Sequence, residues 1–161
     1  MEQSPTLSAI ELLKNCDVIF YESYTSPAIR PDYSSELSSI LERKIETVKR
    51  EFVEDGRKIL DLAKTQNVAL VCSGDPLVAT THQDLRTRAI RLGIETKVLH
   101  GSSILLSISG ELGLSSYLFG KTVTMTRTPM QYTAYHTIYQ NLLRGLHTIL
   151  LLEWDESSNA H

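Results

Sequence analysis

The run Ser73-Gly74-Asp75-Pro76 contains residue types that could do chemistry at a ligand site. It directly follows an apolar stretch at 68–72 and precedes a segment with helical periodicity. In an open parallel sheet, ligands bind beyond the carboxyl ends of the strands. Gly74 would let the backbone approach a ligand closely, and Asp75 would place a carboxylate there. The same residues are typical of a plain strand-to-helix turn, and by themselves they favour that interpretation.

A second loop of the same kind is His100-Gly101-Ser102-Ser103-Ile104. It follows a predicted strand at 96–99 and opens an apolar helix, so its backbone N–H groups could meet an acceptor. Capping of the helix by Ser102 or Ser103 would use these residues without any ligand. Two such loops, at the ends of two strands, could face one cleft.

Other known catalytic and ligand-binding motifs are absent, because the residues do not have the spacing that these motifs require. Gly120-Lys121-Thr122 looks like the end of a phosphate-binding loop, but Ser115 stands where that loop needs its first glycine, and a predicted strand follows instead of a helix. The sequence has no dinucleotide-binding glycine pattern and no serine elbow. None of its histidines has a Cys or His partner at ligand spacing, so we expect no metal: His82, His100, His136, His147 and His161.

The elements that must position these loops alternate between strands and helices. Apolar runs predict strands at 17–21, 45–48, 68–72, 96–99, 122–125 and 148–152. Helical periodicity predicts a first helix with Ser4 as N-cap and Pro5 at its first helical position, and a second helix around Leu37, Ile40 and Leu41. Further helices are predicted at 52–64, 80–92, 102–112 and 132–143, with a loop at 24–32. The alternation predicts an α/β fold, a three-layer αβα arrangement with a mostly parallel sheet.

Three details of this pattern can be checked. Glycines at 93, 113 and 145 each follow a predicted helix, where a left-handed residue ends helices. The helix at 102–112 is apolar on most sides, which predicts burial. The helix at 132–143 carries its large side chains on one face, which we expect in the core, with self-association as the alternative: Tyr132, Tyr135, Tyr139, Leu142 and Leu143. We expect one domain over residues 1–155 and a frayed tail at 156–161.

Composition limits the class of protein. The 161 residues are 42% hydrophobic and 22% charged, with a net charge of −3, which is typical of a folded domain and not of a nucleic-acid binder. No apolar run approaches the length of about 20 residues that spans a bilayer, so no membrane segment is expected. The start of the sequence does not resemble a signal peptide, and Cys16 and Cys72 lie in no paired motif, so we expect a reducing, cytoplasmic setting.

A longer run carries a resemblance. The segment from Gly74-Asp75-Pro76 through Ala79-Thr80-Thr81-His82, with Asp84-Leu85-Arg86 after it, resembles the diphthine synthases, a branch of the tetrapyrrole methylase-like methyltransferases. The wider group shares the Gly-Asp-Pro turn, whereas Ala-Thr-Thr-His looks particular to the diphthine branch. The similarity runs from about 7 to 155, with further matches at 22–26, at 50–51, at His100 with Ser103 and Ile104, at Tyr117 with 119–121, and at 144–148.

The resemblance implies the N-terminal domain of a tetrapyrrole methylase-like fold and S-adenosyl-L-methionine as cofactor, with no metal. It implies transfer of methyl groups to the amino group of a modified histidine on translation elongation factor 2, a step of diphthamide biosynthesis, by a homodimer. The implied cofactor contacts are Asp75, Val78, Ser103, Ile104 and Leu152, and the implied acceptor-side residues are Glu22 and Tyr24. It identifies no catalytic base.

The sequence departs from this pattern at both ends. Members of the family begin with one more strand and a Gly-rich loop, and they continue into a second α/β domain. We therefore expect weak activity or none from this chain alone. Two alternatives stay open: a truncated or non-catalytic remnant that serves as a scaffold or dimerisation domain, and a methyltransferase that acts on a tetrapyrrole.

Overall fold

The structure is a computed structural model that describes residues 5–25, 33–127 and 132–153. The chain divides into two compact units, Met1–Gly101 and Ser102–His161, and each is described by itself. Ser4, most of the predicted loop at 24–32 and the predicted tail at 156–161 lie outside the described residues. Among the described residues, no helix is both long and apolar enough to cross a membrane.

The first unit is built on a three-stranded parallel sheet. Its strands are β1 (Val18–Glu22), β2 (Glu46–Val48) and β3 (Val68–Val71), in the order β2-β1-β3. In the central strand, Phe20 lies opposite Glu46 of β2 and Leu70 of β3. The parallel pairing predicted from the apolar runs is confirmed, and it brings the carboxyl ends of all three strands to one edge of the sheet.

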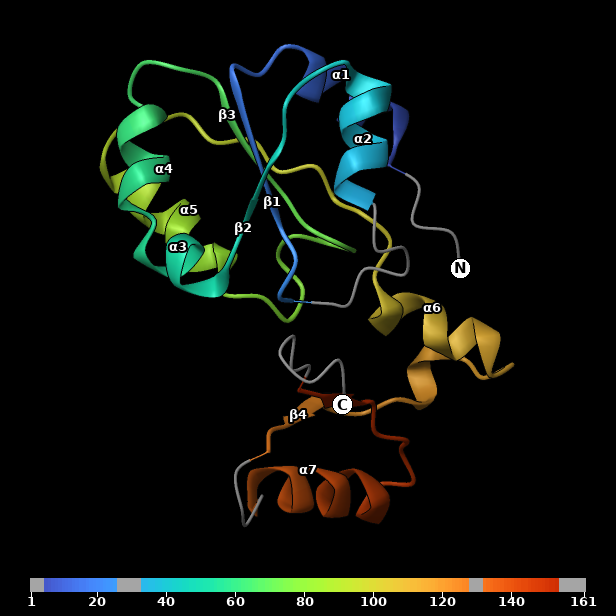
Figure 1. Cartoon of the computed structure of the whole chain (residues 1–161). Helices are drawn as coiled ribbons and strands as arrows, with labels where there is room; N and C mark the ends of the chain where they lie inside the picture. Colours follow the sequence, from blue (N-terminus) through green and yellow to red (C-terminus); the bar gives the residue numbers. More distant parts are fainter. Residues whose placement is uncertain (1–4, 26–32, 128–131, 154–161) are drawn as a thin grey trace. The chain divides into compact units, whose positions relative to one another are not determined.

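Helices cover both faces of this sheet (Figure 1). On one face, α1 (Leu7–Lys14) and α2 (Tyr33–Leu41) pack around Ile19. On the other face, α3 (Arg50–Asp55), α4 (Arg57–Leu62) and α5 (His82–Arg91) pack around Phe20. Neighbouring side chains of β1 point to opposite faces of the sheet, so Ile19 and Phe20 pack into different hydrophobic cores. The three-layer αβα arrangement is confirmed in this unit.

Two predicted helix boundaries were wrong. The first helix begins at Leu7 and not at Pro5, because the Thr6 side chain accepts a hydrogen bond from the Ala9 N–H at 3.2 Å and caps the helix there. The helix predicted at 52–64 is two helices, α3 and α4. Gly56 separates them with a φ of 63°, in the left-handed region where glycine is favoured.

The predicted strand at 96–99 does not form. No strand in the described part of the chain pairs with residues 94–100, although Ile94, Thr96 and Val98 are half-buried while Glu95 and Lys97 are exposed. The side chains of this segment therefore alternate in burial as those of a strand do. A strand also needs hydrogen bonds to a neighbouring strand, and that partner is a property of the tertiary structure.

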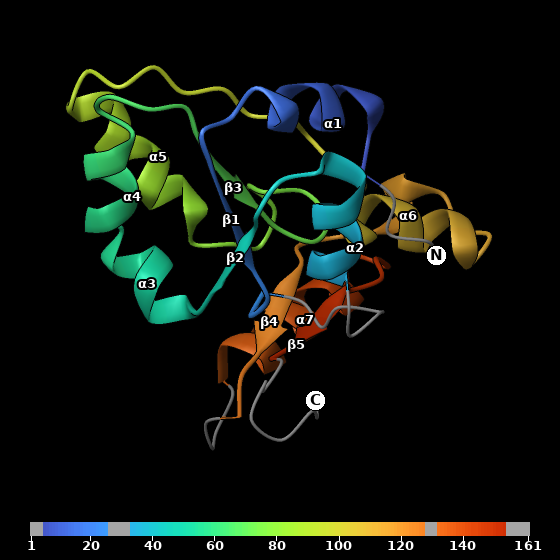
Figure 2. The same cartoon turned by 45° about the horizontal axis from the view of Figure 1, so that its top comes forward.

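The second unit contains α6 (Ile104–Glu111), the short 3₁₀ helix η1 (Ser116–Leu118), β4 (Val123–Met125), α7 (Tyr132–Leu143) and β5 (Leu150–Leu152). β4 and β5 pair in parallel, and α7 lies beside them (Figure 2). The buried Asn141 of α7 holds this unit together, because its amide bonds both the N–H and the carbonyl of Lys121 and also the Thr148 hydroxyl.

Both predictions of burial in this unit were wrong. In α6, Leu106 is 77% exposed, and Ser109 is the residue that the helix buries. In α7, the face predicted to lie in the core is exposed, and the buried positions are Ala134, Thr137 and Asn141. These small and polar residues allow α7 to approach β4 closely, whereas the large side chains would hold it away. The predicted helix ends are confirmed, with positive φ at glycines 93, 113 and 145.

Candidate functional site

The loop between β3 and α5 is organised around the side chain of Asp75. Gly74 has a φ of 86°, as predicted for a close turn, and Asp75 is only 8% exposed. The carboxylate of Asp75 accepts a hydrogen bond from the Leu77 N–H at 2.9 Å and another from His100 Nδ1 at 2.8 Å. It also accepts one from the Gly101 N–H. A single buried carboxylate therefore ties this loop to residues 100 and 101.

The contact between the two segments is also close at the backbone. A Cβ on Gly101 would lie 2.3 Å from the carbonyl oxygen of Gly74, which is too short for any side chain. Close packing thus requires glycine at position 101, whereas the backbone N–H that bonds Asp75 could come from any residue except proline. The structure brings the Gly-Asp-Pro loop against the start of the His100 loop as far as Gly101, whereas the expectation that the two loops face one cleft stays a prediction.

These hydrogen bonds set the electrostatics of Asp75. Burial by itself would raise the pKa of this carboxyl, but the Leu77 N–H, His100 and the Gly101 N–H favour its charged form and hold its pKa below the ordinary value. Asp75 is therefore an ionised, internally bonded carboxylate at neutral pH. These hydrogen bonds fix the conformation of the loop. They also occupy most of the accepting capacity of the Asp75 carboxylate oxygens with groups of the same chain.

The end of the central strand places a second carboxylate at the same edge of the sheet. Glu22 is 1% exposed, and its Oε2 accepts the N–H groups of Tyr24 at 3.1 Å and Thr25 at 2.9 Å. Its Oε1 is buried and has no hydrogen-bond partner among the residues that the structure describes. Burial, and then the carboxylates of Glu22 and Asp75, raise the pKa of Cys72 to about 12. Cys72 is therefore an inert thiol at neutral pH.

Tyr24 lies buried next to this carboxylate. The Arg50 guanidinium stacks over its ring at 4.7 Å, and its hydroxyl lies 3.3 Å from His82 Nε2. Burial raises the pKa of Tyr24, and Glu22 raises it further, although a hydrogen bond with Thr81 opposes the shift. In the sequence His82 is one of several scattered histidines and the end of the Ala-Thr-Thr-His match, but neither observation gave this residue a role in the site. The signal that could have pointed to it was its place at the end of Ala-Thr-Thr-His.

The remaining predicted contacts are placed as follows. Val78, in the first unit, is half-buried, and its N–H bonds the carbonyl of Asp75. In the second unit, Ser103 caps α6 by accepting the Leu105 N–H at 3.2 Å, which confirms the capping interpretation for this residue. Ile104 and Leu152 are both 49% exposed. That all of these residues contact one cofactor stays a prediction.

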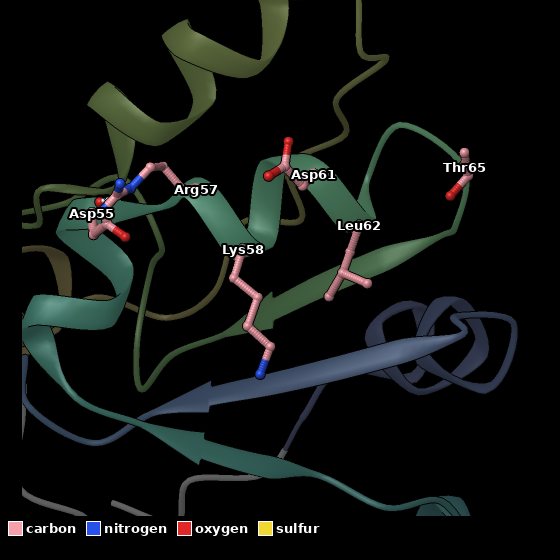
Figure 3. A pocket seen from close by; sticks show the side chains of 6 residues that line it. All are labelled: Asp55, Arg57, Lys58, Asp61, Leu62 and Thr65. Atoms are coloured by element: carbon pink, nitrogen blue, oxygen red, sulfur yellow. Dashed lines mark hydrogen bonds and ion pairs between the residues drawn. The ribbon is translucent and has the colours of Figure 1, made fainter.

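A different feature is a shallow hollow of about 630 Å³ on α4 (Figure 3). It is lined by charged side chains that already have partners: Arg57 lies 2.7 Å from Asp55, Lys58 lies 3.4 Å from Glu46, and Asp61 pairs with Lys64 at 2.7 Å. Because these charges neutralise one another, nothing in this hollow calls for a ligand. Among the described residues, no cluster of three or more His, Cys, Asp or Glu side chains could hold a metal ion.

The first unit has the architecture of an α/β protein, with a parallel sheet covered on both faces. Proteins of this class bind small ligands in the loops at the carboxyl edge of the sheet. Residues 3–158 match the family model described as Tetrapyrrole (Corrin/Porphyrin) Methylases. The match covers nearly the whole sequence, so the chain belongs to the tetrapyrrole methylase family.

Within this family the chain is similar to diphthine synthases. It is 37% identical over 166 residues to the diphthine synthase of Methanosarcina acetivorans, covering 96% of this chain and 61% of that protein. It is 41% identical over 156 residues to the diphthine synthase of Staphylothermus marinus, covering 92% and 57%. A solved structure of diphthine synthase superposes with a TM-score of 0.87 at 30% identity, covering 94% of this chain and 59% of that one. The chain spans about three fifths of the length of these relatives.

Proposed function

We propose that this chain forms the cofactor-binding part of a diphthine synthase. That enzyme would transfer methyl groups from S-adenosyl-L-methionine to the amino group of the modified histidine of translation elongation factor 2. The observation that carries the proposal is the buried Asp75 carboxylate, which closes the Gly-Asp-Pro loop onto Gly101 at the carboxyl edge of the sheet. The Gly-Asp-Pro segment, which carries the strongest sequence resemblance, thus forms a loop whose shape is held by hydrogen bonds. The similarity to diphthine synthases supports the choice of branch.

The residues present fit this cofactor in their chemistry. S-adenosyl-L-methionine combines an aromatic base, whose faces are apolar and whose edge is polar, with polar ribose and amino-acid ends. Ile104 and Leu152 expose aliphatic side chains that could cover an apolar ring, and Val78 is half-buried. Asp75 and Ser103 would contribute through the loops that they organise, because their side-chain oxygens already accept hydrogen bonds within the chain. Backbone N–H and carbonyl groups of these loops would then make the polar contacts.

The cofactor supplies a methyl group on a sulfonium, and transfer to an amine is an in-line displacement that needs no covalent intermediate with the protein. The contribution of this chain is to hold donor and acceptor in line, which is worth up to about 7–11 kcal/mol in favourable cases. On the acceptor side we propose Glu22 and Tyr24. One buried carboxylate oxygen of Glu22 has no partner among the described residues and would favour a positively charged neighbour. We also propose a homodimer that works in the cytoplasm on a protein substrate, without direct contact to nucleic acid.

Calorimetry with S-adenosylhomocysteine tests the proposal. We expect micromolar binding by the chain, weakened at least about tenfold by Asp75→Ala, because that change releases three hydrogen bonds that shape the loop. Asp61→Ala is the matched control: it removes an exposed carboxylate on α4 and should leave the affinity unchanged. Millimolar or no binding that Asp75→Ala does not alter would favour the non-catalytic scaffold instead.

The acceptor is tested separately. The chain should bind elongation factor 2 that carries the modified histidine more tightly than the unmodified factor, and Tyr24→Phe should reduce this preference. Binding of a tetrapyrrole in place of the factor would support the alternative methyltransferase and contradict our choice of branch.

A further inference from the structure

His82 has a buried imidazole for which the proposed function has no use. It begins α5, is 5% exposed and lies at the end of the Gly-Asp-Pro loop. Its ring contacts two parts of the first unit that are far apart in the sequence. Nδ1 lies 3.0 Å from the carbonyl oxygen of Pro76, and Nε2 lies 3.3 Å from the hydroxyl of Tyr24. The rings of Tyr24 and His82 meet edge to face, with centroids 6.3 Å apart.

The chemistry of these partners fixes the proton on the ring. A carbonyl oxygen can only accept, so Nδ1 must carry the hydrogen and donate it to Pro76. In the neutral ring Nε2 is then an acceptor, and the Tyr24 hydroxyl donates to it. The Thr81 hydroxyl, which also bonds Tyr24, fills the remaining acceptor position on the Tyr24 oxygen. One tautomer therefore satisfies every group in this small network.

Each end of this bridge is itself held in place. At one end, the Pro76 carbonyl also accepts the Thr80 hydroxyl at 2.6 Å, and Ala79 has a positive φ of 56°, so residues 76–82 fold tightly around that oxygen. At the other end, the backbone N–H of Tyr24 is bonded to Glu22, the last residue of the central strand. A shift of the Gly-Asp-Pro loop therefore reaches Tyr24 through two hydrogen bonds.

We propose that His82 is a positioning residue that couples the cofactor loop to the acceptor side, so that filling the loop with cofactor fixes Tyr24. The inference rests on the proposed function and deepens it. His82 itself touches neither reactant. It transmits the position of the Pro76 carbonyl to the Tyr24 hydroxyl, and the Ala-Thr-Thr-His run supplies the residues that make this link.

The test uses variants that cut the bridge at different bonds. Tyr24→Phe removes only the hydroxyl and leaves the ring under Arg50. His82→Asn keeps an amide donor near the place of Nδ1 for Pro76 but loses the contact with Tyr24, whereas His82→Gln reaches toward Tyr24 and loses the contact with Pro76. Thr87→Ala is the control, because it removes a hydroxyl from the same helix whose hydrogen bond, to the Gln83 carbonyl, stays within α5.

Affinity for S-adenosylhomocysteine is measured by calorimetry on the full chain. We expect Tyr24→Phe and His82→Asn each to weaken binding about fivefold, which corresponds to the loss of one hydrogen bond. The double variant Tyr24→Phe/His82→Asn should bind no more weakly than either single variant. Thr87→Ala should bind like the wild type. Additive losses, or a Tyr24→Phe variant that binds as tightly as the wild type, would overturn the coupling while leaving the proposed function intact.

A second readout is the tautomer of His82, by ¹⁵N NMR of histidine-labelled chain, with the signal assigned by its loss in His82→Asn. We expect a protonated Nδ1 and a bare Nε2, and a change in the Nε2 shift when S-adenosylhomocysteine is added. A hydrogen on Nε2 in the free chain would contradict the bridge. A wild-type chain with the expected tautomer but no binding would overturn the proposed function and the coupling with it.

Discussion

The two units of this chain use their buried side chains differently. In the first, a sheet covered on both faces buries large apolar residues such as Phe20 and Leu37. Three of its buried polar residues lie at or beyond the carboxyl ends of β1 and β3: Glu22, Asp75 and His82. In the second, a two-stranded sheet buries small and polar residues, among them Thr137 and Asn141. Most of its large apolar side chains on α6 and α7 are exposed.

The two units therefore differ in the interactions that stabilise them, and the first is the unit that holds buried ionisable groups at its sheet edge. A sheet with helices on both faces can bury enough apolar surface to hold charged groups in fixed positions at its edge. The second unit relies on hydrogen bonds from Asn141 to join α7 to the segments before β4 and β5. The comparison predicts that truncating a buried apolar side chain will destabilise the first unit most. Removing a hydrogen-bonding side chain should destabilise the second unit most.

The largest effect should come from Phe20→Ala. Phe20 is completely buried in the central strand, so the change should lower the free energy of unfolding of the first unit by about 3–5 kcal/mol. Denaturant unfolding, with hydrogen exchange to assign the loss to β1 and β3, measures it. Leu106→Ala in the second unit is the control, and it should change stability by less than about 0.5 kcal/mol because the side chain is exposed. Equal losses would show that the two units do not differ in this way.

A smaller effect is expected from Asn141→Ala. The change leaves the backbone N–H and carbonyl of Lys121 without their partner, which should cost the second unit about 2–3 kcal/mol. Asn15→Ala is the matched control, since Asn15 makes one exposed hydrogen bond to the Glu11 carbonyl at the end of α1. Loss of exchange protection should be confined to residues of β4, β5 and α7. Protection lost equally in β1 would contradict the separation of the units.

The smallest stability effect is expected from Asp75→Asn, and it depends on pH. The pKa of Asp75 in the folded chain lies below its ordinary value of 3.8, so the folded state binds this proton more weakly than the unfolded state does. The charged carboxylate therefore stabilises the fold above that pH, and this contribution is lost as the pH falls through the lower folded-state pKa. Asp75→Asn should cost about 1–2 kcal/mol at pH 7 and progressively less in acid.

The measurement is thermal or urea unfolding of both proteins from pH 7 to pH 3. The two stability curves should converge as the pH falls. Asp61→Asn, an exposed carboxylate on α4, provides the matched curve that should follow the wild type. A constant difference between wild type and Asp75→Asn across this range would show that the charge of Asp75 contributes nothing.

Local features of the fold were predictable because neighbouring residues determine them. The apolar run that forms β3, the turn residues after it and the glycines that end helices all act within a few positions in the sequence, and each was found where expected. The organising carboxylate of the candidate site, Asp75, was also identified this way. Its partner His100 was named only for its place in the second loop and the resemblance.

Pairing and burial were decided by the tertiary structure. The segment at 96–99 has the side-chain alternation of a strand, yet only a neighbouring strand with open hydrogen-bonding groups could make it one. The periodicity of α7 was evident, but which of its faces turns inward depends on how closely a helix can approach β4. The link from Pro76 through His82 to Tyr24 joins residues up to 58 positions apart, so only the folded backbone could bring them together.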